Sequence, residues 1–146
     1  MDVTFGWYHE AYITKDGKLF VCPKAKMSSI KIDEIQDGMR QLVEVKSLPA
    51  KTKVRQVTFT RRRMFVMTEN GELFVFPITE IAPSQEEMMF SKKRPEFTGE
   101  VDVEKPVRVK EMPALKMISS GVDHLLALDR KGQVWAMGND TFGQCG

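Results

Sequence analysis

The sequence predicts an all-β fold of short antiparallel strands, arranged as three similar units in a single domain over residues 1–146. Three observations predict this fold. Related segments recur at residues 3–23, 57–77 and 118–146, which is the pattern of a repeat protein. Every copy contains three short runs of β-forming residues separated by turn residues. Glycine and proline interrupt the chain too often for long amphipathic helices, and the one alternative is a short helix near residues 32–42.

The composition fits a globular protein and excludes two classes. The chain has 22 basic and 20 acidic side chains, a formal charge of +2, which is too balanced for a protein whose task is to wrap a polyanion. Its hydrophobic content of 42% is enough for a core, and no stretch approaches the roughly 18–20 apolar residues of a membrane-spanning helix. Two distant cysteines, Cys22 and Cys145, give no disulfide framework. We therefore expect an intracellular protein in a reducing compartment.

Each repeat copy predicts strands in a fixed order. A first run leads into a polar turn, a second run follows, and a tight turn connects it to a third run. The tight turns place glycine after a polar residue, at Asp16-Gly17, Asn70-Gly71 and Lys131-Gly132. The first two dipeptides favour the type I′ turns of two-residue hairpins, because both central residues there need a positive φ. Every copy is therefore expected to form a three-stranded antiparallel meander.

Two inserts, residues 24–53 and 78–114, separate the copies and leave room for a fourth strand in a unit. The second insert is long for a compact domain, and loops of more than about 12–15 residues are usually functional or mobile. One interpretation is a hairpin through Phe97–Val101 and Val107–Val109 that lengthens the unit. The other is a docking element for a partner at the pliable run 88–90.

Repeats of this length, with three or four strands per unit, are typical of β-propeller blades, since a small sheet cannot bury both of its faces alone. Closed propellers have about four to eight blades. Three blades therefore cannot close a ring, and an apolar face stays open at each end of the stack. We expect the missing surface to come from the rest of a longer chain, of which this sequence is a piece, or from a protein partner that completes the propeller.

The third copy carries glycines, a histidine and an aromatic residue at a characteristic spacing. These residues are Gly121, His124, Gly132, Trp135, Gly138, Asn139, Gly143, Gln144 and Gly146. The copy resembles the repeat of the regulator of chromosome condensation family, and this resemblance implies the blades of a seven-bladed β-propeller. The first copy keeps Gly6, His9 and Gly17 of the pattern, and the second keeps Gly71. Cys145 stands where the family usually has leucine.

The histidines have a structural interpretation. His9 and His124 occupy the same repeat position, and Arg63 takes that position in the second copy. Because arginine cannot replace a metal ligand, we expect these side chains to brace a turn by hydrogen bonding. The sequence contains no zinc-ligand spacing, nucleophile motif or phosphate-binding loop. We therefore expect no catalytic site, no metal and no cofactor.

Two basic clusters and one apolar run are the candidate partner contacts. They are Arg61, Arg62, Arg63, Lys92, Lys93, Arg94, Met88, Met89 and Phe90. Arginine forks pair with carboxylates or phosphates in bidentate fashion, so the basic clusters could contact an acidic protein surface or a phosphate group. The alternative is that they are solvated turns. Neither cluster has the interleaved aromatic residues of a platform for single-stranded nucleic acid.

The sequence therefore predicts a non-catalytic scaffold that binds proteins through loops displayed on rigid blades. The family resemblance implies several activities among members: nucleotide exchange on a small GTPase combined with nucleosome docking, ubiquitin ligation, and assembly of mitochondrial ribosomes or respiratory complexes. Three hypotheses follow, namely an assembly scaffold, a guanine nucleotide exchange factor for a small GTPase, and an RNA- or ribosome-associated module. The Gly-Gln-Cys-Gly ending resembles the mitochondrial members and favours that compartment.

Overall fold

The structure, a computed structural model, describes residues 2–5, 9–23, 42–80 and 99–138. Within these ranges the chain forms antiparallel strands and turns. The strands are β1 (Asp2–Phe5), β2 (Glu10–Ile13), β3 (Leu19–Cys22), β4 (Val43–Glu44), β5 (Val54–Phe59), β6 (Arg63–Thr68), β7 (Leu73–Glu80), β8 (Gly99–Val101), β9 (Val107–Arg108), β10 (Leu115–Ser120), β11 (His124–Asp129) and β12 (Val134–Gly138). None of the described ranges contains a helix long and apolar enough to cross a membrane.

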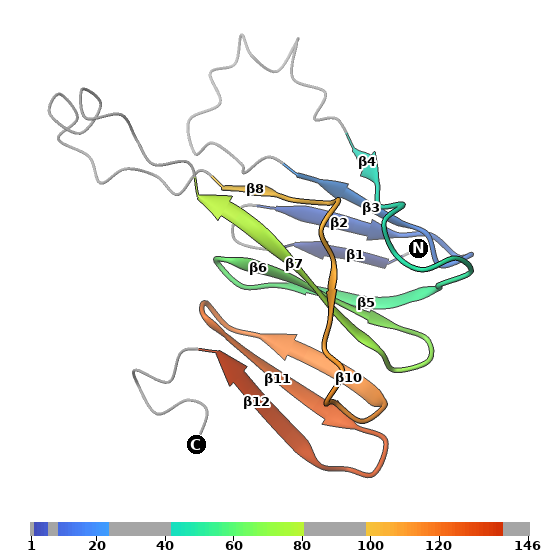
Figure 1. The fold of residues 1–146 in the computed structure, drawn as a ribbon, viewed down its shortest axis with the longest axis vertical. Coiled ribbons are helices and arrows are strands. Elements are labelled where there is room, and N and C mark those ends of the chain that lie inside the picture. The colour runs from blue at the N-terminus through green and yellow to red at the C-terminus, as the bar shows by residue number, and fades with distance from the viewer. Residues whose placement is uncertain (1, 6–8, 24–41, 81–98, 139–146) are drawn as a thin grey trace, which may run out of the picture.

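The strands form three sheets, which we call blades 1, 2 and 3 (Figure 1). Blade 1 has the order β1-β2-β3-β4, and blade 2 has the order β5-β6-β7-β8 with β9 also paired to β7. In the described ranges blade 3 has the order β10-β11-β12. Figure 1 shows the blades stacked one after another from the N-terminal to the C-terminal end of the chain. The predicted fold class, a partial β-propeller of three blades with about three or four strands each, is confirmed.

The core lies between the blades. The cluster between blades 1 and 2 includes Ala11, Ile13, Leu19, Val21, Val57, Phe59, Met64, Val66, Phe74 and Phe76. The cluster between blades 2 and 3 consists of Phe65, Met67, Leu73, Leu115, Ile118, Leu125 and Ala127. Alternate side chains of a strand point to opposite faces of its sheet, so the central strand β6 contributes to both clusters. Blade 2 is thus buried on both faces by its neighbours.

The three hairpin turns share one geometry, which differs from the predicted type I′ turn. Gly17, Gly71 and Gly132 have φ angles of 82°, 81° and 88°. The residues before them have negative φ, because Lys51 is the only non-glycine residue with positive φ in the described ranges. In each turn the glycine N–H donates to the carbonyl three residues earlier, as from Gly17 to Thr14 at 3.0 Å. These are three-residue loops, in which a type I turn is followed by a left-handed glycine.

A side-chain acceptor at the start of each turn explains this geometry. Thr14, Thr68 and Asp129 stand there, and their side-chain oxygens accept hydrogen bonds from backbone N–H groups two or four residues later, at 2.8–3.2 Å. Asp129 also accepts the indole N–H of Trp135 at 3.0 Å. The indole and the backbone donors hold the pKa of the Asp129 carboxyl below its ordinary value of 3.8, although burial opposes them. The third turn is therefore closed by a charged acceptor at neutral pH.

The second insert supplies two separate outer strands rather than the predicted hairpin. β8 pairs with the C-terminal half of β7, and β9 pairs with its N-terminal half. Residues 99–101 and 107–108 are strands, as the sequence predicts, but they do not pair with each other. The physical reason is the length of β7, which at 8 residues offers both short strands an edge. Phe97 lies outside the described ranges.

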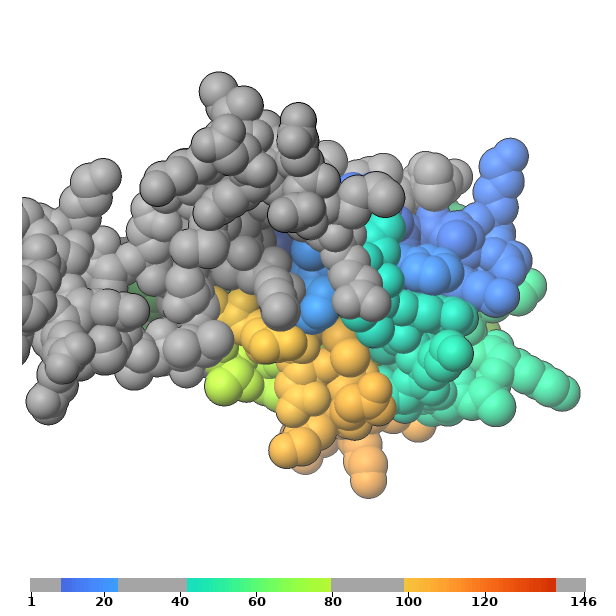
Figure 2. Space-filling view, turned by 90° about the horizontal axis from the view of Figure 1, so that it is seen from above, coloured from blue at the N-terminus to red at the C-terminus, as the bar shows by residue number. Residues whose placement is uncertain are grey.

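Residues 99–112, here called the outer segment, contact all three blades. At its start, β8 bonds to His9 and Pro23 of blade 1, each over a distance of 2.9 Å. Its middle part pairs with β7 of blade 2. At its end, Val109 and Met112 pack on the cluster between blades 2 and 3. Figure 2 shows the outer segment in orange, lying beside the teal chain that leads into β5.

Candidate functional site

Each blade has one face turned toward the next blade, which we call its forward face. It carries Ala11, Ile13, Leu19 and Val21 in blade 1, and Phe65, Met67, Leu73 and Val75 in blade 2. The following blade covers both sets, so that all of these side chains are buried except Val75, which is half-buried. Side-chain burial on the forward face is therefore a regular property of a blade that has a successor.

The forward face of blade 3 is exposed in the part of the chain that the structure describes. It carries Met117, Leu126, Leu128, Val134 and Ala136. Val134 is 67% exposed, whereas its repeat equivalents Leu19 and Leu73 are each 1% exposed. Met117 and Leu126 are 51% and 39% exposed. An apolar surface that blades 1 and 2 bury is open in blade 3.

A backbone hydrogen bond repeats at each blade boundary. Val54 N donates to Gly17 O, and Leu115 N donates to Gly71 O, both at 2.9 Å. The hairpin glycine of one blade thus holds the first strand of the next, and a Cβ on Gly71 would lie 2.5 Å from Leu115 N. For Gly132, the third glycine of this series, no described atom lies within 4 Å of an added Cβ. Its turn lacks the neighbour that the other two turns have.

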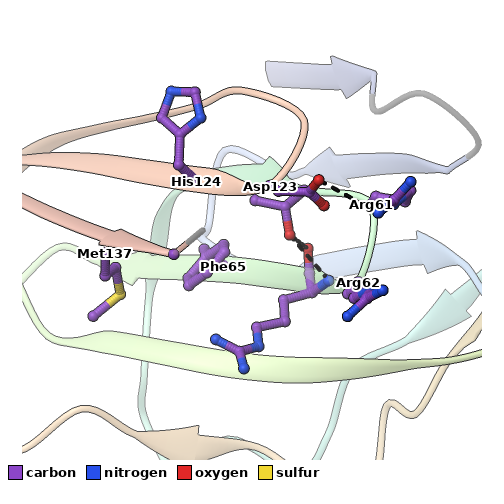
Figure 3. A pocket seen from close by; sticks show the side chains of 9 residues that line it. Arg61, Arg62, Phe65, Asp123, His124 and Met137 are labelled. Atoms are coloured by element: carbon purple, nitrogen blue, oxygen red, sulfur yellow. Dashed lines mark hydrogen bonds and ion pairs between the residues drawn. The ribbon is translucent and has the colours of Figure 1, made fainter. Parts of the chain in front are cut away.

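A second candidate surface is a cavity of about 380 Å³ between blades 2 and 3, at the rim opposite the hairpin glycines (Figure 3). We call it the arginine pocket. It is lined by Thr60, Arg61, Arg62, Arg63, Phe65, Asp123, His124, Met137 and Gly138. The turn between β5 and β6 supplies Arg61 and Arg62, β6 begins with Arg63, and the turn between β10 and β11 supplies Asp123. The structure therefore places the first predicted basic cluster in the wall of a cavity, where Arg62 and Arg63 are exposed.

Arg61 makes one described ion pair in the arginine pocket and has one buried donor without a described acceptor. Arg61 Nη2 lies 3.4 Å from Asp123 Oδ2, which is a long ion pair between half-exposed groups. Arg61 Nε is buried and has no hydrogen-bond partner among the described atoms. Figure 3 shows Asp123 turned toward Arg61, with Phe65 and Met137 close to each other on another side of the cavity. The pocket thus combines three cationic groups and one carboxylate with an apolar surface.

The other predicted contact residues lie outside the described ranges. These are Met88, Met89, Phe90, Lys92, Lys93 and Arg94. The repeat positions Gly6, Asn139, Gly143, Gln144 and Gly146 also lie outside them, as does Cys145. Of the alternative helix near residues 32–42, only Leu42 is described, and it is exposed and not helical.

The two repeat histidines make different contacts. His9 is 3% exposed, its Nε2 lies 2.9 Å from Gly99 O of blade 2, and its ring stacks on Phe59 at a centroid distance of 5.8 Å. The bond described for His9 therefore runs to β8 of the next blade, and the adjacent turn residues 6–8 lie outside the described ranges. The ring of His124 packs against Gly121, where a Cβ would overlap the imidazole. The glycine at that repeat position makes room for the histidine.

Acidification is expected to weaken the contact between blades 1 and 2 through His9. Burial lowers the pKa of His9 below its ordinary value of 6.5, although the bond to Gly99 opposes the shift. Between the two values the unfolded chain binds a proton that the folded chain does not. The stabilisation is therefore complete above 6.5 and is lost as the pH falls through the lower, folded-state pKa. Urea unfolding at a series of pH values measures this loss.

The variant His9→Gln is the control for this prediction, because it keeps a neutral hydrogen-bond donor that does not titrate in this range. The free energy of unfolding of the variant should depend less steeply on pH below 6.5 than that of the unchanged protein. Equal pH dependence in the two proteins would assign the effect to other groups.

Sequence reasoning missed the polar contacts that join blades 2 and 3. The side-chain amide of Gln56 accepts a hydrogen bond from Ile118 N at 2.9 Å and donates to Ile118 O at 2.7 Å. Ser120 Oγ donates to Phe59 O at 2.7 Å. The feature of the sequence that could have indicated these contacts is the polar residue Gln56 beside the buried Val57 in β5. The polar residue faces the next blade, and not solvent as such a pattern usually indicates.

The fold defines the class of protein, since stacked antiparallel sheets joined in this order are blades of a β-propeller. Residues 117–144 match the family model described as the Regulator of chromosome condensation (RCC1) repeat. This segment of the chain is therefore similar to an RCC1 repeat, and its described part lies in the third blade of a partial β-propeller. No curated protein matches the sequence.

Solved structures of RCC1-type proteins have the same fold. Yeast RCC1 (Prp20), in a crystal structure with Kap60 bound, has 17% identity and a TM-score of 0.62 over 95% of this chain and 32% of its own. Prp20p from Saccharomyces cerevisiae has 16% identity and a TM-score of 0.62 over 99% and 33%. Human WBSCR16 has 15% identity and a TM-score of 0.60 over 94% and 32%. At such identities the likeness concerns the fold alone, and this chain spans about a third of each relative.

Proposed function

We propose that this chain is a non-catalytic protein-interaction module whose blade 3 receives a further blade of the same kind on its forward face. One observation carries the proposal: Val134 is 67% exposed at the repeat position where Leu19 and Leu73 are each 1% exposed. In blades 1 and 2 the occupant of this face is the next blade. The same type of sheet is therefore the occupant we propose for blade 3.

The free energy of burying apolar side chains favours a protein surface on the forward face of blade 3. Complete burial of a valine or leucine side chain stabilises by about 1.5–3 kcal/mol. Because Val134 and Leu126 are 67% and 39% exposed, burying their exposed parts would contribute about 1.5–3 kcal/mol in total, before the cost of association. The carbonyl of Gly132 corresponds to the carbonyls of Gly17 and Gly71, which accept a hydrogen bond from the next blade at 2.9 Å. The exposed apolar side chains of the forward face and the carbonyl of Gly132 thus both favour a further blade as the partner.

The solved relatives support a role in protein binding. Yeast RCC1 (Prp20) is bound to Kap60 in one structure, and the other yeast report concerns the binding properties of Prp20p to Gsp1p and histones. From these we take only the general role, because this chain spans about a third of their length. Guanine nucleotide exchange, RNA or ribosome association, a role in assembly and a mitochondrial location stay predictions from the family resemblance.

Self-association of the isolated 146-residue chain tests the proposal, because a second copy is then the only source of another blade. We expect light scattering coupled to size exclusion to show a mass that rises with concentration. The double variant Leu126→Glu/Val134→Glu should remain monomeric, because it places two charges on the forward face.

The matched control is Leu42→Glu/Val107→Glu, which also replaces two exposed apolar side chains, 47% and 64% exposed, but outside the forward face of blade 3. It should associate as the unchanged chain does. A chain that is monomeric at every concentration, or association that is equal in the two double variants, would overturn the proposal.

A further inference from the structure

The arginine pocket is distinct from the forward face of blade 3 and is not explained by blade stacking. It lies at one rim of the interface between blades 2 and 3, while the forward face is on the far side of blade 3. Three consecutive arginines on a turn are not needed to connect β5 to β6. The equivalent turn of blade 3 has Val122, Asp123 and His124 at the corresponding positions. The chemistry of the pocket therefore requires its own account.

The turn that carries the arginines is held in place from two sides. Thr60 N donates to Arg63 O at 2.9 Å, and Thr60 Oγ1 accepts from Arg63 N at 3.1 Å. Arg61 N donates to Val122 O of blade 3 at 2.7 Å. The backbone positions of the three arginines are thus fixed relative to both blades. Binding of a ligand would then cost less conformational entropy, because the backbone that carries the arginines is already ordered.

The described lining residues carry three positive charges and one negative charge. The negative charge is that of Asp123, whose Oδ2 lies 3.4 Å from Arg61 Nη2. Arg61 Nε has no acceptor among the described atoms. No hydrogen bond or ion pair connects the exposed side chain of Arg63 to a described residue. The charged groups that line the cavity sum to +2, from three arginines and one aspartate. An anionic ligand is the chemical class that this arrangement favours.

The remaining walls distinguish between anions. Phe65 is 3% exposed, so it cannot present a ring face on which a nucleic-acid base could stack. The described lining contains no helix N-terminus and no glycine-rich turn of consecutive N–H groups, the usual elements of phosphate sites. Met137, which is half-buried, instead offers apolar surface to the methylene groups of an acidic side chain. The volume of about 380 Å³ is at the lower end of ligand cavities, which begin at about 300 Å³.

We propose that the arginine pocket binds the carboxylate side chains of an acidic segment of a partner protein. Arg61 and Arg63 donate to the carboxylates through their guanidinium groups, and the methylene groups of the segment pack toward Met137. The binding site and the stacking surface of blade 3 can be occupied independently, because they lie on different surfaces of the molecule.

Fluorescence anisotropy with a labelled oligoglutamate peptide tests this proposal on the 146-residue chain. We expect saturable binding that weakens at least about tenfold in Arg61→Ala/Arg62→Ala/Arg63→Ala, because charge-assisted hydrogen bonds are lost. The same experiment measures the binding of a labelled oligouridylate, and it measures whether inorganic phosphate displaces the bound peptide. The proposal is overturned if the RNA binds more tightly than the peptide, or if phosphate displaces the peptide at a comparable concentration.

The matched control is Arg55→Ala/Lys116→Ala/Arg130→Ala, which makes the same change in net charge. Its residues line a second cavity of about 350 Å³ together with Glu69. The control should bind the peptide with the affinity of the unchanged chain. If the two triple variants lose equal affinity, the loss comes from net charge alone and the proposal is contradicted. Arg63→Glu provides a second variant, since this exposed side chain has no described polar partner to lose. Unchanged binding in Arg63→Glu would also contradict the proposal.

Discussion

Truncation of Leu73 to alanine is expected to lower the free energy of unfolding by about 2–5 kcal/mol. Leu73 is 1% exposed and belongs to the cluster between blades 2 and 3. Removing its branched end leaves a cavity that rigid sheets on both sides cannot close. Urea unfolding followed by circular dichroism measures the loss.

Val134→Ala is the matched control, because Val134 holds the same repeat position on the forward face of blade 3. At 67% exposure, its truncation should change the free energy of unfolding by no more than about 0.5 kcal/mol in the monomeric chain. Comparable losses at the two positions would mean that Val134 is buried in solution. The forward face would then already have an occupant.

Gly71→Ala is expected to destabilise the chain by about 2–5 kcal/mol. An alanine costs about 1–2 kcal/mol at a left-handed φ, and the φ of Gly71 is 81°. The added Cβ would also lie 2.5 Å from Leu115 N and 2.8 Å from Leu115 O. Those are backbone atoms at the start of blade 3, so their displacement strains a packed interface and adds about 1–3 kcal/mol.

Gly132→Ala separates the cost of a left-handed φ from the cost of the close contact with the next blade. Its φ of 88° carries the same backbone penalty, but no described atom lies within 4 Å of the new Cβ. We expect a loss of about 1–2 kcal/mol, clearly smaller than that of Gly71→Ala in the same denaturation experiment. If the two substitutions were equally costly, the contact of Gly71 with Leu115 would have no energetic role.

The sequence predicted the parts of the fold that depend on local pattern. Each copy encodes its own meander, because strand runs and a hairpin glycine recur within about 20 residues. The turn type was predicted incorrectly, since the dipeptides Asp16-Gly17 and Asn70-Gly71 received more weight than the acceptors Thr14 and Thr68 before them. Those acceptors bond to N–H groups at 3.0 and 3.2 Å. The signal was local and readable in the sequence.

The contacts between blades could not be predicted in the same way. Gln56 bonds to Ile118, and His9 bonds to Gly99, across separations of 62 and 90 residues. Such pairs depend on the stacking distance and rotation of neighbouring sheets, which no local pattern encodes. The arginine cluster was singled out from its composition, but the approach of Asp123 to Arg61 follows only from how blade 3 lies on blade 2.

The outer segment, residues 99–112, has a mechanical consequence. It is bonded to blade 1 through His9 and Pro23, paired with β7, and packed against blade 3 through Val109 and Met112. Sliding any sheet past its neighbour must stretch or detach this one strip of chain (Figure 1). We therefore expect the outer segment to couple the unfolding of the three sheets, in addition to the direct contacts between the blades, and a cut between β8 and β9 to weaken this coupling.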